Sequence, residues 1–194
     1  MGDNLFAITL SLFLLMDPIG NIPIYLTILS EIDLKKRQKI ILREKLFALF
    51  IILIFAIFGN EFLAILHISS QAIFLSGGII LFLMALKMIF PERGSLLNSL
   101  DIEGEPLIFP LAIPLVAGPA VLAAVMIYSA ELTSQGSLFL AIALAWLAST
   151  IILIFSTYLQ RWLGIRGIKA LERLMGLILI LIATNMLLEG YHRL

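Results

Sequence analysis

The feature that most constrains this chain is a series of six long apolar runs. They cover roughly residues 5–30, 46–66, 71–90, 107–127, 137–159 and 173–190. Several approach or exceed the roughly 20 apolar residues that an α-helix needs to cross about 30 Å of hydrocarbon. The sequence therefore predicts an all-α membrane protein with six transmembrane helices.

The composition supports this prediction. Of the 194 residues, 61% are hydrophobic and 13% are charged, whereas a soluble domain averages about 45–50% apolar and about 25% charged residues. The polar segments between the runs are too short to form soluble domains, so we expect one membrane domain over residues 1–194. The chain has no cysteine, which excludes thiolate metal sites, and its two histidines cannot build a metal site alone. We expect no metal and no cofactor.

The connections between the predicted spans differ in charge. We expect a basic linker at Glu31–Lys45, a tight connection at His67–Ser70 and a longer loop at Pro91–Pro106. A short polar turn follows at Glu131–Gly136, and a second basic linker at Gln160–Glu172. The first, third and fifth connections, with the adjoining span ends, hold 12 of the 13 lysines and arginines. Short loops rich in these residues face the cytoplasm. We therefore predict a multi-pass protein of the bacterial inner membrane with both termini periplasmic.

The two halves of the chain resemble each other. Three ordered matches have offsets of 96, 100 and 98 residues: 18–23 with 114–119, 51–55 with 151–155, and 78–88 with 176–186. Each half, about 1–95 and about 100–194, contains three predicted crossings. Because three is odd, the second half enters the membrane in the opposite orientation. Such inverted repeats are typical of secondary transporters, with the substrate site near the midplane. The alternative is a duplication without transport.

Paired prolines interrupt the first and fourth predicted spans. Proline removes a backbone donor and clashes with the preceding turn of a helix. Freed backbone groups inside a membrane are tolerated only against protein or water. We therefore expect broken or re-entrant first and fourth helices whose ends meet near the bilayer centre, and we keep simple kinking for packing as the alternative. The residues of the two interruptions are Pro18, Gly20, Asn21, Pro23, Pro114, Gly118 and Pro119.

Asp17 directly precedes the first interruption. A carboxylate at the bilayer centre costs about 2.5–3.5 kcal/mol on insertion scales and is a candidate functional group by default. It could carry a proton or bind a coupling cation. Alternatively, it could cap a half-helix that begins at Pro18. Thr184 and Asn185 in the sixth span are further candidates to line a pathway, although most such residues bond to neighbouring helices.

The segments Met16–Pro23 and Pro110–Pro119, together with Gly77–Leu83, resemble the MarC family of bacterial integral membrane proteins. The resemblance runs essentially from end to end. It implies a six-span inner-membrane protein in a group related to neutral amino acid transporters. No functional residue is carried over from the family as established.

These observations predict a secondary transporter or exporter of a small neutral solute, such as glycine or alanine, coupled to a proton or sodium ion. The predicted partners are the lipid bilayer and this solute. Nucleic acid is not expected, because topology explains the basic residues, and the sequence leaves the oligomeric state open. An exporter of other metabolites or drugs is the first alternative. A non-transport scaffold is another. We do not expect an enzyme, because no nucleophile–base pair appears in the sequence.

Overall fold

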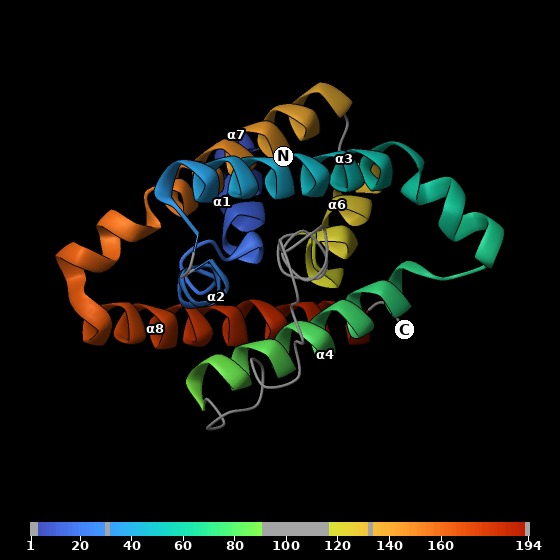
Figure 1. Cartoon of the computed structure of the whole chain (residues 1–194). Helices are drawn as coiled ribbons and strands as arrows, with labels where there is room; N and C mark the ends of the chain where they lie inside the picture. The colour runs from blue at the N-terminus through green and yellow to red at the C-terminus, as the bar shows by residue number, and fades with distance from the viewer. Residues whose placement is uncertain (1–3, 30–31, 91–116, 132–133, 193–194) are drawn as a thin grey trace.

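The computed structural model describes residues 4–29, 32–90, 117–131 and 134–192. Within these ranges the chain is helical and contains no strand. The helices, drawn in Figure 1, are α1 (Leu5–Met16), α2 (Ile22–Ile28), α3 (Leu34–Leu66), α4 (Ser70–Ile89), α6 (Pro119–Glu131), α7 (Gln135–Ile154) and α8 (Ser156–His192). The prediction of an all-α protein is confirmed for this part of the chain. The predicted loop 91–106 and the first part of the fourth span, including Pro114, lie outside the described residues.

The first basic linker was predicted as a connection and is mostly helical, whereas the second contains a non-helical residue, Gly164, at which two helices meet. Most of the first linker forms the start of α3, which is 33 residues long, or about 50 Å at roughly 1.5 Å per residue. The second linker lies within α8, which has a kink at Gly164 (φ 67°). Lysine, arginine, glutamate and glutamine are good helix formers, so these charged segments extend the neighbouring apolar helices instead of ending them.

The tight connection 67–70 forms as predicted, and residues 132–133 of the short polar turn 131–136 lie outside the described residues. His67 ends α3 in the left-handed conformation (φ 53°), and the side chain of Ser69 accepts a hydrogen bond from the Ala72 N–H at the start of α4. At the other connection, Ser134 caps α7 by accepting a hydrogen bond from the Ser137 N–H. Serine is a favoured residue at the start of a helix because its oxygen replaces a missing backbone acceptor.

The helices form two outer pairs with the shorter helices between them. In Figure 1, α3 and α7 lie along one side of the molecule, and α4 and α8 run side by side along the other. Helix α1 contacts α7 and α8, whereas α6 contacts α3 and α4. The short helices α1 and α6 thus bridge the outer pairs.

The contact between α4 and α8 is the most extensive between two helices. A Cβ atom at Gly78 of α4 would lie 3.1 Å from the carbonyl oxygen of Ala183, and one at Gly176 of α8 would lie 3.1 Å from that of Ala85. Later residues of α4 therefore meet earlier residues of α8, so the helices are antiparallel. Small residues let membrane helices approach this closely.

Three of the described helices are long and apolar enough to cross a membrane: Gln71–Ile89, Gln135–Ile154 and Ser156–His192. Leu5–Met16 and Pro119–Ala130 are shorter apolar helices. Side chains on the outer face of α8, such as Leu177 and Leu181, are exposed, whereas Gly176 and Ala183 on its inner face are buried. An outer apolar surface of this kind is suited to lipid.

Candidate functional site

The first predicted helix is broken at the expected place. Helix α1 ends at Met16, and α2 begins at Ile22. Between them Asp17 adopts the left-handed conformation (φ 40°, ψ 59°), and its N–H donates to the Leu14 carbonyl at 3.1 Å. Left-handed backbone is uncommon for residues other than glycine, although aspartate is among those that tolerate it. The turn at 17–21 therefore separates two helices of the first predicted span.

The turn is held by buried hydrogen bonds of its own residues. The N–H of Gly20 donates to Oδ1 of Asp17 at 3.0 Å, and Nδ2 of Asn21 donates to the Met16 carbonyl at 3.2 Å. Asp17, Pro18, Gly20 and Asn21 are all buried. The prediction that Asp17 caps a helix beginning at Pro18 was wrong: residues 18–21 form a turn, and α2 begins only at Ile22. Asp17 instead caps this turn.

Gly20 is required by close packing. A methyl group at this position would overlap the carboxylate of Asp17 and the terminal methyl group of Met88, which belongs to α4. Pro23 lies in the first turn of α2, where the lack of an N–H costs little. The two prolines and the glycine thus allow the turn to lie directly against α4.

The described part of the second interruption begins just before α6. Pro119 is the first residue of α6, and the Gly118 carbonyl accepts a hydrogen bond from the Leu122 N–H at 3.1 Å. Gly118 is buried and Pro119 is exposed. These positions match the end of the first interruption, where Pro23 is the second residue of α2. Pro114 lies outside the described residues, so the break in the fourth span stays a prediction.

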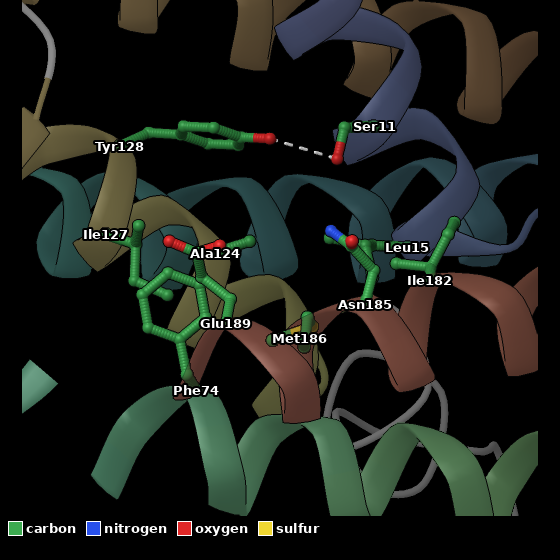
Figure 2. Close-up of a pocket in the computed structure, with 10 residues that line it drawn as sticks. All are labelled: Ser11, Leu15, Phe74, Ala124, Ile127, Tyr128, Ile182, Asn185, Met186 and Glu189. Carbon is green, nitrogen blue, oxygen red and sulfur yellow. Dashed lines mark hydrogen bonds between the residues drawn. The ribbon is translucent and has the colours of Figure 1, made fainter. Parts of the chain in front are cut away.

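A hollow of about 250 Å³ lies on the α1 side of the turn. Figure 2 shows Asn185 and Glu189 extending from α8 toward the place where the Tyr128 hydroxyl donates to Ser11 Oγ at 3.1 Å. The complete lining is Ser11, Leu15, Phe74, Ala124, Ile127, Tyr128, Ile182, Asn185, Met186 and Glu189. Asn185 therefore lines a hollow, as its selection as a candidate anticipated. Thr184 is not among the lining residues, and its hydroxyl donates to the Ile180 carbonyl of its own helix at 2.8 Å.

A second hollow, of about 550 Å³, lies on the α2 side of the turn. Its lining comes from α2, α3 and α8 and consists of Pro23, Leu26, Thr27, Arg37, Gln160, Ile165, Ile168, Lys169 and Glu172. Along α8 the two linings are separated by residues 173–181, a distance of about 15 Å at roughly 1.5 Å per residue. Buried Gly176 and Leu179 lie in this interval. The buried turn thus lies between two polar hollows.

A buried polar network connects the turn to two outer helices. Lys45 of α3 is 0% exposed, and its Nζ donates to Oγ of Ser149 in α7. Ser149 Oγ also lies 3.8 Å from Sδ of Met16, the last residue of α1. Nε1 of Trp146 donates to the Lys45 carbonyl at 2.7 Å. This network therefore joins a cationic side chain to the residue that precedes Asp17.

The burial of Lys45 was not predicted, because this residue was assigned to the basic linker 31–45. A signal was present: Ile41, Lys45, Ala48 and Ile52 are spaced three or four residues apart and share one face of a helix. All four are buried. Extending the apolar periodicity of the second span backward would have included Lys45 on that face.

The carboxylate of Asp17 and the polar groups that line the two hollows are of chemical types that bind protons, cations or small polar solutes. A buried carboxylate can gain or lose a proton, and turn carbonyl groups can accept hydrogen bonds. In the part of the chain that the structure describes, no three His, Cys, Asp or Glu side chains gather as metal ligands.

Comparison with known proteins extends these observations. The family described as "MarC family integral membrane protein" matches residues 2–194. The inner membrane protein YhgN of Escherichia coli K12 is 45% identical over 97% of this chain and 96% of its own length. A membrane protein of Buchnera aphidicola subsp. Schizaphis graminum is also 45% identical, over 97% of this chain and 96% of its own length. One from Chlamydia pneumoniae is 37% identical over 96% and 93%. These relatives carry the designation UPF0056.

No solved structure matches the chain significantly. The sequence match nevertheless covers almost every residue, including the turn at 17–21 and the start of α6. The chain is an integral membrane protein of the MarC family.

Proposed function

We propose that the protein is a secondary transporter of a small neutral solute, such as glycine or alanine, coupled to a proton or sodium ion. The observation that carries the proposal is the position of Asp17: a buried carboxylate at the break between α1 and α2, with one hollow lined by α1 and the other by α2, neither of which Asp17 itself lines. A solute held beside the turn could reach one hollow or the other as the surrounding helices shift. The hollow on the α1 side, about 250 Å³, is below the roughly 300–1,000 Å³ of drug-sized pockets and suits a compact solute, whereas the one on the α2 side, about 550 Å³, is within that range.

The proposal includes six spans arranged as two inverted repeats. The contacts between α4 and α8 support it because they are reciprocal. Gly78 packs against Ala183, and Gly176 packs against Ala85; adding 98 to the numbers of the two α4 residues gives the two α8 residues. A two-fold axis that relates the two halves of the chain would produce such reciprocal contacts. The bridging contacts of α1 with the later helices and of α6 with the earlier ones also agree with such an exchange.

The proposed orientation has both termini periplasmic and the chain in the inner membrane. The segregation of basic residues supports this orientation, and the relative from E. coli is called an inner membrane protein. With this orientation, the hollow lined by Asn185 opens toward the periplasm, and the one lined by Lys169 opens toward the cytoplasm. The proposal is for a transporter and not an enzyme.

The test is transport in proteoliposomes with a broad panel of labelled amino acids. We expect uptake or counterflow of a small neutral amino acid that depends on a proton or sodium gradient. Asp17→Asn keeps the size of the side chain but cannot ionise, so it should abolish or change this dependence. Asp33→Asn is the matched control, because Asp33 is exposed at the start of α3 and its side chain makes no capping hydrogen bond.

Two results would contradict the proposal. Absence of transport for the whole panel in either direction would remove the transporter assignment. Transport that keeps the same pH and sodium dependence in Asp17→Asn would remove Asp17 from the coupling mechanism.

A further inference from the structure

Lys45 is preceded by a second fully buried ionisable residue, Glu44. The side chain of Glu44 is 0% exposed. Glutamate is almost never fully buried unless it is paired. On α3, Glu44 follows buried Ile40 and Ile41 and precedes buried Ala48, so it lies on the face that packs against the other helices. Glu44 was predicted to belong to the basic linker 31–45, and it has no role in the proposed function.

Only one oxygen of the Glu44 carboxylate is engaged. Nε and Nη2 of Arg43 both lie 3.0 Å from Oε1. Oε2 is buried and has no hydrogen-bond partner among the described residues. Consecutive residues of a helix do not face each other, so Arg43 must reach sideways and contacts one oxygen only. A buried polar atom without a partner costs free energy and requires an explanation.

The surroundings of Glu44 include the helix that follows the break. Ile22 and Tyr25 of α2, with Leu29 directly after it, belong to one buried cluster with Ile40 and Ile41 of α3. Tyr25 is 1% exposed and lies close enough to Glu44 for the two groups to interact electrostatically. Among the described residues, the ionisable groups that interact with Glu44 are Arg43 on α3 and Tyr25 on α2.

The space around Oε2 of Glu44 determines which ligand it can bind. Glu44 is fully buried and lines neither of the two hollows. A solute ammonium group needs space, and a metal ion needs several oxygen ligands. A proton needs only one free carboxylate oxygen. It also removes the negative charge, which lowers the cost of burial.

We propose that Glu44 is a second proton-binding site of the protein, which takes up a proton on Oε2 while α2 packs against α3. Opening of this contact would let water reach the carboxylate and release the proton. The link to solute movement rests on the proposed transport function. The binding of the proton does not, because it follows from the buried geometry alone.

The test is infrared spectroscopy of the purified full-length protein in lipid over a range of pH. A protonated carboxyl group has a C=O band distinct from the carboxylate bands. In the Asp17→Asn background, which removes the other acid that is buried within the described ranges, we expect a remaining band that disappears as the pH rises. The additional change Glu44→Gln should abolish it. Glu61→Gln is the control, because Glu61 is an exposed glutamate of the same helix, and it should leave the band unchanged.

Glu44→Asp guards against a loss of folding, because it keeps an ionisable group and should keep a titrating band. A spectrum that is the same with and without Glu44→Gln would overturn the proposal, whether or not the protein transports anything. Transport that keeps its pH dependence in Glu44→Gln, despite loss of the band, would overturn the link to solute movement. Neither result would by itself refute transport, which the amino-acid panel tests separately.

Discussion

At the level of single residues, the break after α1 depends on a glycine as much as on prolines. Pro18 and Pro23 prevent a continuous helix, but they do not explain how the turn packs. Gly20 does, because both the Asp17 carboxylate and Met88 of α4 occupy the space that a side chain would need. The absence of a side chain thus sets the distance between the turn and α4.

We predict that Gly20→Ala destabilises the protein by about 1–3 kcal/mol, the usual cost of forcing an extra methyl group into a packed site. The expected observation is a lower midpoint of thermal unfolding in detergent. Gly136→Ala is the control, because Gly136 lies in the exposed first turn of α7, where a Cβ would meet only Ser134 Oγ at 3.7 Å. That variant should be neutral or slightly stabilising. Equal midpoints for the two variants would contradict the packing argument.

The candidate site was only partly predictable from individual residues. Asp17, Gly20 and Asn21 lie together in one turn at the interruption that the sequence predicted, because an acid and paired prolines inside an apolar run are rare; their binding role stays a prediction. Glu44 and Lys45 were missed, because hydropathy treats a charged residue beside an apolar run as the end of the span. The burial of Lys45 had a local signal, its helical spacing from buried Ile41 and Ala48. The segments that pack against this face are distant in sequence and could not be identified from that spacing.

At the level of helices, the places where a helix breaks were predicted better than the places where a helix continues. Proline has one strong local effect, so the break between α1 and α2 lies where the sequence indicated. Charged segments are ambiguous, since lysine, arginine and glutamate suit both a solvated loop and an exposed helix. The beginning of α3 and the middle of α8 follow the second possibility. The kink at Gly164 (φ 67°) is the local departure within α8.

The crossing of α4 and α8 gives a prediction at the same scale. Gly78→Ala and Gly176→Ala should each lower stability by about 1–3 kcal/mol, because each added Cβ would lie 3.1 Å from a carbonyl oxygen of the other helix. Since the contacts are reciprocal, we expect the two losses to be similar. The measurement is the midpoint of thermal unfolding in detergent.

The controls for this crossing are the neighbouring residues, Ile79→Ala and Leu177→Ala, which are 52% and 55% exposed on the outer face of the same helices. In detergent these variants should change the midpoint less than the glycine variants do. If only one of the two glycine variants were destabilising, the reciprocal packing of the halves would be refuted.

For the whole molecule, the arrangement of helices and the distribution of charge are two separate observations from which the membrane topology can be inferred. Helices α3 and α8 each have a basic segment, around Lys36 and around Arg166. The antiparallel contact of α4 with α8 fixes the relative direction of two spans without reference to charge. Together with the tight connection at His67, it implies that both basic segments face the same side of the membrane.

The absence of cysteine allows this topology to be tested with single cysteines. Lys36→Cys, Arg166→Cys and Tyr191→Cys change exposed residues. In intact cells, a membrane-impermeant maleimide should label Tyr191→Cys only, because the other two positions should face the cytoplasm. All three should react after the membrane is permeabilised, which controls for local accessibility. Labelling of Lys36→Cys and Tyr191→Cys from the same side would mean that an odd number of crossings does not separate them, and the inverted six-span arrangement would then be excluded.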